Sequence, residues 1–162
     1  MQTFLPYKDF TKSAKALDSK RLNKQILEGY QILKVLSSND PRAAWRNHPA
    51  VKMWRYYEHS LYDYVMAMVA EADKRGIKTD KNVYNLTILE KNEGRYWGDE
   101  IPDWYEDKAK MARLTTTHKA NLYRKDPQYY FEFHTAVAKS KPCCPDRKTP
   151  CQYYWITHEE AA

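Results

Sequence analysis

The sequence predicts an all-α protein: a compact, single-domain helical fold over residues 1–162, with three main helices and an irregular, aromatic-rich C-terminal tail. Only 4 of the 162 residues are glycine, and long segments separate the helix-breaking residues. Within these segments apolar residues recur at the spacing of a helix face. No internal repeat, low-complexity linker or shift in composition divides the chain, so we expect one domain with a substantial core.

The first helix is predicted to begin after Pro6, with Thr11 or Ser13 as its cap, and to run to about Leu36. The polar loop of residues 37–41 ends it. Its apolar positions share one helix face, and they are Leu22, Ile26, Tyr30 and Leu33.

The second helix is predicted to start at residues 47–49, where Pro49 lies in the first turn, and to end at Gly76. A weaker helical segment spans residues 81–89, and a loop with two glycines covers residues 93–104. The third helix is predicted over residues 106–125 and stops before Pro127. We expect the residues after it to be mostly irregular.

The composition favours a nucleic-acid partner. The chain has 27 Lys and Arg against 21 Asp and Glu, a net charge of +6, and 14% aromatic residues, many of them beside Lys or Arg. Cations suit phosphates and flat rings stack on bases, although an amphipathic helical protein could also use tyrosine in its core. No apolar run approaches the roughly 20 residues of a membrane span, and no signal-peptide pattern opens the chain, so we expect a cytoplasmic protein without a membrane partner.

Polar residues form a stripe on the first predicted helix, beside its apolar face. Arg21, Lys24, Gln25 and Glu28 fall at i, i+3, i+4 and i+7. They are either a solvated charged face or the wall of a cleft that offers two cations, an amide and a carboxylate.

On the second predicted helix, Glu58 falls on the apolar line. A carboxylate there must pair, take up a proton or serve a function, because burying it alone costs several kcal/mol. Arg55 is the local partner; the alternative role is a general acid or an electrostatic stabiliser. A cationic edge suited to a phosphate backbone lies beside it, formed by His48, Lys52, Arg55 and His59.

The end of the third predicted helix carries hydroxyl, imidazole, amide and cationic side chains next to aromatic rings. The pattern suits a nucleic-acid contact surface, and equally an ordinary polar helix end, where cations meet the negative pole. The residues are Thr117, His118, Asn121, Arg124 and Lys125.

The tail contains all three cysteines, Cys143, Cys144 and Cys151, which with His134 or His158 could form a zinc site. Their spacing matches no standard zinc pattern, and adjacent cysteines are awkward ligands for one metal, so we expect no metal. A reduced, intracellular setting is the natural interpretation of an odd number of cysteines. No glycine-rich phosphate loop and no serine or cysteine triad is present in the sequence.

Several motifs together resemble the pyrimidine-dimer DNA glycosylases, the phage-type endonuclease V repair enzymes. They are MQTFLPY at residues 1–7, ALDxxRLxKQxxE at 16–28, WxNHPAxKMWRxxE at 45–58, THxxNLxRKDP at 117–127 and YYW at 153–155. The likeness is strongest to a bacterial and phage branch with the MQTFLPY start. It spans nearly the whole chain and is weakest at residues 77–112 and around the cysteines.

The resemblance implies a compact helical domain whose amino terminus is threaded into the DNA-binding face. The terminal α-amine would attack the sugar C1′ of a damaged nucleotide in double-stranded DNA, and β-elimination through a Schiff base would then cut the strand. We expect a monomer without a cofactor. An α-amine titrates near 8, about 2.5 units below lysine, so more of it is neutral and nucleophilic near pH 7.

The catalytic residues expected from this resemblance are Met1, Gln25, Glu28 and Glu58. Gln2 is too large for removal of the methionine, so the free amine is expected to be that of Met1. Ungapped alignment puts Gln25 where the family has its glutamate, and glutamine cannot carry a proton. Glu28 or Glu58 would then assist, and we expect Glu58 in the site and Glu28 on the phosphate side.

The expected DNA contacts are Arg21, Lys24, Asn47, His48, Lys52, Arg55, Thr117, His118, Asn121, Arg124 and Lys125. We expect the cations among them to share one basic face, with the ordered amino terminus close to Arg21, Gln25 and Glu28. Two alternatives remain: a DNA-binding or modified-base-processing protein of the same fold without lyase activity, and a helical protein-interaction domain.

Overall fold

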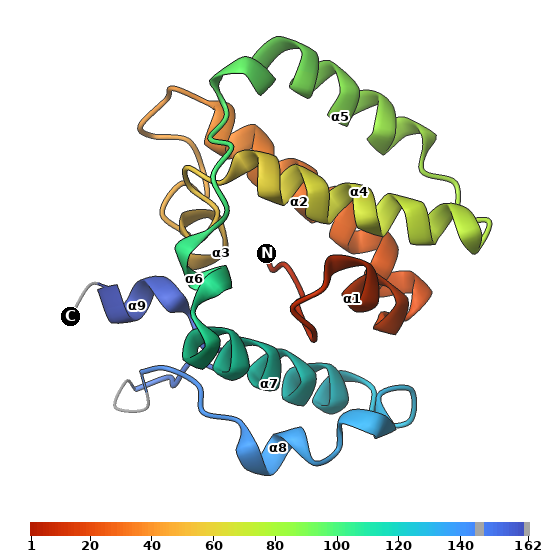
Figure 1. The fold of residues 1–162 in the computed structure, drawn as a ribbon, viewed down its shortest axis with the longest axis vertical. Coiled ribbons are helices and arrows are strands. Elements are labelled where there is room, and N and C mark those ends of the chain that lie inside the picture. Colours follow the sequence, from red (N-terminus) through yellow and green to blue (C-terminus); the bar gives the residue numbers. More distant parts are fainter. Residues whose placement is uncertain (145–147, 161–162) are drawn as a thin grey trace.

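The computed structural model describes residues 1–144 and 148–160, and every regular element in these ranges is a helix, which confirms the all-α class (Figure 1). The elements in chain order are α1 (Phe10–Ala16), α2 (Ser19–Ser37), α3 (Pro49–Lys52), α4 (Glu58–Lys74), α5 (Asp80–Glu93), the 3-10 turn η1 (Gly94–Tyr96), α6 (Asp103–Glu106), α7 (Lys108–Lys125), the 3-10 turn η2 (Phe131–Phe133), α8 (Ala136–Lys139) and α9 (Ile156–Glu160).

The first predicted helix is two helices, α1 and α2, and not one. Asp18 caps α2: its carboxylate accepts from the Arg21 backbone N–H, while Leu17 before it is extended. The Tyr130 hydroxyl bonds both the backbone N–H and the carboxylate of Asp18, which fixes this break against the tail. An N-cap aspartate inside a periodic apolar pattern therefore divides the helix.

The second predicted helix is also divided, into α3 and α4. Residues 53–57 form a turn between them, in which Tyr56 has a left-handed φ of 73°. Trp54 is fully buried in this turn and its indole N–H donates to the Thr3 hydroxyl. The burial of Trp54 against the amino-terminal segment thus outweighs the tendency of residues 49–74 to form one continuous helix. Gly76, with a φ of 74°, ends the segment as predicted.

The remaining helices follow the predicted order with different bounds. α5 extends to Glu93, further than the predicted residues 81–89, and α7 matches the third predicted helix. Beyond α7 the described residues contain only short helical pieces, as expected for an irregular tail. No helix in the described ranges combines the length and apolarity that crossing a membrane requires.

The core joins the two ends of the chain. α2 packs along α4, and Gly29 allows this close approach because a Cβ there would clash with the Val65 side chain. The buried cluster runs without division from Phe4 to Ile156, so the first residues and the tail belong to the same core. In Figure 1 the amino terminus lies in the middle of the molecule, between α2 and α4 on one side and α7 on the other.

Candidate active site

The amino-terminal segment is extended and clamped from several helices. Residues 2–5 are buried. The Phe4 N–H donates to Gln25 Oε1 of α2 at 2.8 Å, and the Leu5 N–H donates to His118 Nδ1 of α7 at 2.7 Å. From α4, the Tyr64 hydroxyl donates to the Phe4 carbonyl at 2.7 Å. The expected ordered amino terminus is therefore present.

Gln25 is buried, with 1% of its surface exposed, and it links this segment to a carboxylate. Its Oε1 accepts from the Phe4 N–H and shares the single proton of the Tyr64 hydroxyl with the Phe4 carbonyl, and its Nε2 donates to Glu28 Oε2 at 3.1 Å. Burial raises the pKa of Tyr64 well above its usual value, so this hydroxyl stays a donor. An amide suits the position because it accepts on one side and donates on the other.

Met1 lies between two cavities. One, of about 410 Å³, is bordered by four cations together with Gln25, Glu28 and Tyr153; the cations are Lys20, Arg21, Lys24 and Lys125. The other, of about 550 Å³, is lined by Glu28, Gln31, Lys34 and Trp45 among others. Met1 and Glu28 line both cavities, so the start of the chain and a carboxylate meet at one place.

Glu28 is the carboxylate among the described residues that line these two cavities. Its side chain is 13% exposed, and its Oε1 lies 4.0 Å from the Lys24 ammonium. The expected roles, Glu58 in the site and Glu28 on the phosphate side, stay predictions; of the two, Glu28 is the one that lines cavities together with Met1.

Glu58 lies at the start of α4, in a different cavity from Met1. Its Oε2 accepts from the Gly98 backbone N–H at 3.3 Å, and the Gly98 carbonyl accepts from the His59 N–H at 3.1 Å. The cavity beside it is lined by α2, η1 and neighbouring residues, including Trp97. Glu58 therefore ties the loop after α5 to the first turn of α4. Arg55, the expected partner, donates instead to the Arg46 carbonyl at 2.9 Å.

Aromatic rings and His48 surround the Met1 side of the site. His48 caps α3 by accepting from the Ala50 N–H, and its pKa is lowered by burial and by the nearby positive amino terminus. Its ring meets those of Trp45 and Trp155 edge to face, with centroids 5.5 and 5.9 Å away. Trp45 is 56% exposed with a left-handed φ of 70°, an arrangement that functional sites often contain.

Sequence reasoning did not select Trp45 or Tyr153 as site residues. Both stand inside the quoted motifs, at the start of WxNHPA and in the closing YYW, so a signal was present. Trp45 lies 44 positions and Tyr153 152 positions from Met1 in the sequence, so their place beside Met1 depends on packing between distant segments, which spacing does not reveal.

Three of the expected DNA contacts from α7 are internal. Thr117, His118 and Asn121 are buried, with 0–2% exposure. Thr117 accepts from the Tyr154 N–H, and Asn121 donates to the Gln152 carbonyl, so both hold the tail against α7. This placement corrects the expected contact surface: here the polar residues satisfy backbone groups of the core. Burial lowers the pKa of His118 to about 3, which keeps it neutral as the acceptor for Leu5.

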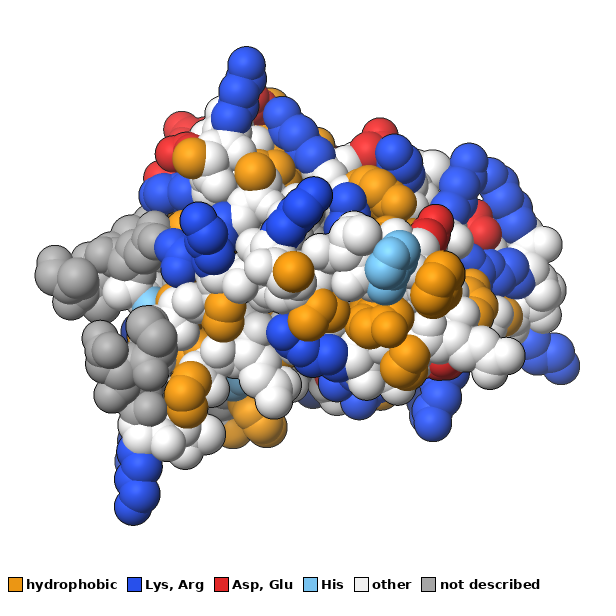
Figure 2. All heavy atoms as spheres, turned by 90° about the horizontal axis from the view of Figure 1, so that it is seen from below, with side chains coloured by type: hydrophobic (Ala, Val, Ile, Leu, Met, Phe, Trp, Pro, Cys, Tyr) orange, Lys and Arg blue, Asp and Glu red, His pale blue; other side chains and the backbone are white. Residues whose placement is uncertain are grey.

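Five of the expected cations border two different cavities, and whether they share one basic face stays a prediction. Arg21, Lys24 and Lys125 border the Met1 cavity, whereas Lys52 and Arg55 border a cavity of about 360 Å³ with Ile156 and Thr157. Asn47 and Arg124 are exposed. Figure 2 views the molecule from below Figure 1, the side of α7 and α8, and shows Lys and Arg side chains spread over this face without a single concentration.

The cysteines are brought together in a way that spacing did not predict. Cys143, Cys144 and Cys151 gather with His158, while His134 lies elsewhere, stacked on Phe131.

A helical protein that places a chain start, a carboxylate and several cations around one cavity has the groups for amine chemistry on a polyanion. The sequence model of the pyrimidine dimer DNA glycosylase family matches residues 1–85, and the chain therefore belongs to this family. DNA is accordingly its substrate class. The matched range holds Met1, Gln25, Glu28, His48 and Glu58, whereas α7 and the cysteines lie beyond it. No curated protein and no solved structure matches the chain.

Proposed function

We propose that this protein is a monomeric DNA glycosylase acting on a pyrimidine lesion or modified pyrimidine in double-stranded DNA, with the Met1 α-amine as nucleophile. The observation that carries the proposal is that Met1 and Glu28 line both central cavities, one of them bordered by four cations. We further propose that residues 1–162 act as one domain, since one core cluster extends from Phe4 to Ile156.

The first step needs the neutral amine. Its lone pair forms a bond to C1′ while the glycosidic bond breaks and its electrons leave with the base, and the new ammonium then gives up a proton. An ordinary α-amine titrates near 8, so about a tenth is neutral near pH 7, far more than for a lysine. In this proposal Glu28 accepts this proton and returns it, a role in which a positioned carboxylate contributes about 10²–10⁴-fold.

The second step opens the sugar. The nitrogen lone pair forms the C=N bond as the C1′–O4′ bond breaks, and O4′ takes a proton. Loss of a C2′ proton and departure of the 3′ phosphate would then cut the strand. In this proposal Glu28 moves the protons, while Gln25 and His118 are positioning residues that hold the amine through the Phe4 and Leu5 backbone.

The surrounding residues suit a DNA strand. Arg21, Lys24 and Lys125 would contact phosphates on either side of the attacked sugar. Trp45 and Tyr153 offer flat rings at the two cavities, where a displaced base or its partner could stack. The target base is set by the shape of these two cavities.

The test is incubation with duplexes that contain a cyclobutane dimer, an abasic site or a modified pyrimidine, with free base and strand cuts measured separately. Borohydride should trap a covalent adduct, and peptide mass spectrometry should locate it on Met1. Protein synthesised with an acetylated amino terminus is the matched control and should give no adduct. An adduct on a lysine would overturn the role of Met1, and DNA binding without base release or adduct would favour the DNA-binding protein of the same fold.

A further inference from the structure

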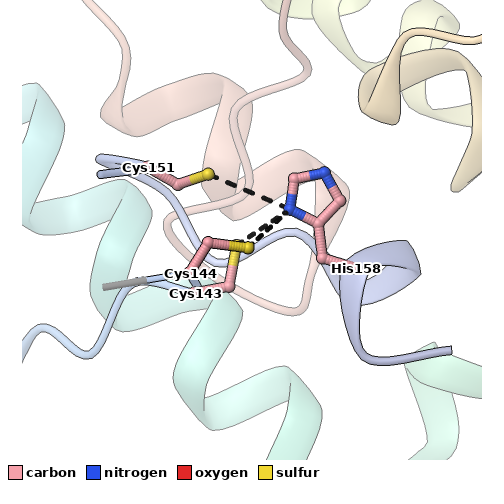
Figure 3. A group of neighbouring side chains, drawn as sticks. All are labelled: Cys143, Cys144, Cys151 and His158. Carbon is pink, nitrogen blue, oxygen red and sulfur yellow. Dashed lines mark hydrogen bonds between the residues drawn. The ribbon is translucent and has the colours of Figure 1, made fainter. Parts of the chain in front are cut away.

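Three cysteines and a histidine of the tail converge on one point (Figure 3). The ligand atoms of Cys143, Cys144, Cys151 and His158 all lie within 4.8 Å of one another. His158 Nδ1 is 3.3, 3.2 and 3.9 Å from the three sulfurs in that order. In Figure 3 all four side chains point toward one another. Cys143 and Cys144 come from one arm of the tail, the segment that ends at residue 144; Cys151 comes from the other arm, the segment that begins at residue 148; and His158 comes from α9.

Hydrogen bonding does not account for this arrangement. An imidazole nitrogen carries either one proton or one lone pair in the ring plane, so it makes one hydrogen bond. Here the same nitrogen faces three sulfurs at similar distances. A single atom facing three others in this way has the place of one vertex of a tetrahedron.

The distances agree with ligands around a zinc ion. With Zn–S bonds of about 2.3 Å and a Zn–N bond of about 2.0–2.1 Å, tetrahedral geometry puts nitrogen about 3.6 Å from each sulfur. The three N···S distances, 3.2–3.9 Å, lie on both sides of this value. We propose that these four residues form a zinc site of the Cys₃His type.

The backbone explains how adjacent cysteines can serve one ion. In an extended chain, neighbouring side chains point to opposite sides. Cys144 instead has a left-handed φ of 57°, a conformation that non-glycine residues seldom adopt. This turn brings the sulfurs of Cys143 and Cys144 to the same side. Adjacent cysteines are awkward ligands for one ion only where the backbone between them is ordinary, which is not the case at Cys144.

The surroundings support the donor set. The Trp155 backbone N–H lies 3.4 Å from Cys143 Sγ, as expected for a donor to a metal-bound thiolate. The Cys143 N–H donates to the Tyr153 carbonyl at 3.2 Å, which holds the two arms of the tail together. Thiolates with imidazole select zinc over magnesium or calcium, and a full set of four protein ligands is typical of a structural ion.

The zinc site would fix one wall of the candidate active site. The segment between Cys151 and His158 carries Tyr153, which lines the Met1 cavity, and Trp155, which contacts His48. It also carries Ile156, which lines the cavity with Lys52 and Arg55. The ion would thus act on DNA binding through the tail. The proposed zinc site does not depend on the proposed glycosylase activity.

The first experiment measures metal content in the full chain, purified under reducing conditions after growth with zinc. Wild type should retain close to one zinc per chain through gel filtration, and Cys151→Ser should lose it. Cys151→His, which keeps a ligand, should retain zinc, and His134→Ala should behave as wild type because His134 lies outside the cluster. Zinc-free wild type, or zinc kept equally by Cys151→Ser, would overturn the proposal.

The second experiment uses wild-type protein, so it tests the zinc site even where Cys151→Ser fails to fold. Cobalt(II) added to reduced, metal-free wild type should give the absorption of a tetrahedral thiolate complex, and zinc should displace it. Chelation should lower the Tm and expose the tail to protease near Tyr153. Two outcomes would overturn the proposal: no cobalt spectrum, or a disulfide between two of the cysteines in protein purified without reductant and carrying no metal.

Discussion

Residues 1–85 and residues 86–160 contribute differently to the candidate site. The first region matches the glycosylase family and carries Met1 and Glu28. The second lies outside the match, yet it supplies His118, which holds Leu5, and Lys125 and Tyr153, which border the Met1 cavity. The family match therefore covers the residues of the proposed chemistry, while the segment that carries the Met1 amine is held in part by His118, far beyond the match.

The largest expected effect distinguishes the proposed catalytic carboxylate of the first region, Glu28, from its structural carboxylate, Glu58. Glu28→Gln should lower base release by about 10²–10⁴-fold, because the amide cannot move a proton. Glu58→Gln is the matched control and should release base at nearly the wild-type rate, since Glu58 bonds Gly98 in another cavity. Single-turnover assays on one lesion duplex would measure both. Equal losses in the two variants would contradict the assignment of Glu28.

A second test measures how much His118, in the second region, stabilises the amino-terminal segment of the first region. His118→Leu removes the acceptor for the Leu5 N–H and should lower the free energy of unfolding by about 1–3 kcal/mol. His118→Asn is the control, because its carbonyl can replace Nδ1. Urea unfolding gives the stabilities. Borohydride trapping should fall further in His118→Leu than in His118→Asn; equal trapping would mean that this clamp does not position the amine.

His118 also predicts a pH dependence. Burial lowers its pKa to about 3, against about 6.5 in the unfolded chain, so below pH 6.5 the unfolded state binds more protons. The contribution is therefore complete above pH 6.5 and declines as the pH falls toward 3, by up to about 1.4 kcal/mol per pH unit. Urea unfolding from pH 7 to 4.5 should show a shallower decline in His118→Asn than in wild type. Parallel curves would contradict the role of His118.

A smaller effect is expected inside the matched region, where α2 meets α4. Gly29→Ala places a methyl group against the Val65 side chain. Overpacking costs about 1–3 kcal/mol, and the better helix propensity of alanine offsets up to about 1 kcal/mol of it. The double variant with Val65→Ala should recover the loss. A stabilised single variant would show that the two helices can separate at no cost.

The smallest effect concerns the cations that border the Met1 cavity. Lys125→Ala should lower the slope of log affinity against log salt by about one, with an effect independent of sequence. Lys24→Ala should do the same from the other region, whereas the exposed Lys81 of α5 provides a control. Fluorescence anisotropy over a range of salt would measure the slopes. An unchanged slope in Lys125→Ala would remove the second region from the DNA surface.

The helical class and the order of the long helices follow from apolar periodicity and breakers, which act locally. The divisions inside the first two predicted helices do not, because they depend on Tyr130 bonding Asp18 and on Trp54 packing against Thr3, contacts between distant segments. In the site, the stripe of Arg21, Gln25 and Glu28 was predictable from spacing.

The assignment of roles was less predictable. Glu28 and Glu58 each satisfy a sequence argument, and they differ only in which cavity the fold brings to them. Polar residues of α7 have the composition of a contact surface, but burial converts them into partners for the tail. The cysteine cluster was not predicted from the sequence, because the left-handed backbone of Cys144 changes the direction of its side chain without altering the spacing.

The bond between Leu5 and His118 joins residues 113 positions apart. At a synthesis rate of about 5–20 residues per second, a ribosome adds that length in roughly 6–23 s. Throughout this interval residues 2–5 have no α7 to close over them, so the start of the chain lacks the His118 acceptor for the Leu5 N–H. Its proposed reactivity is therefore acquired late, when the last long helix docks, and a chain released before α7 would carry the motif without the site.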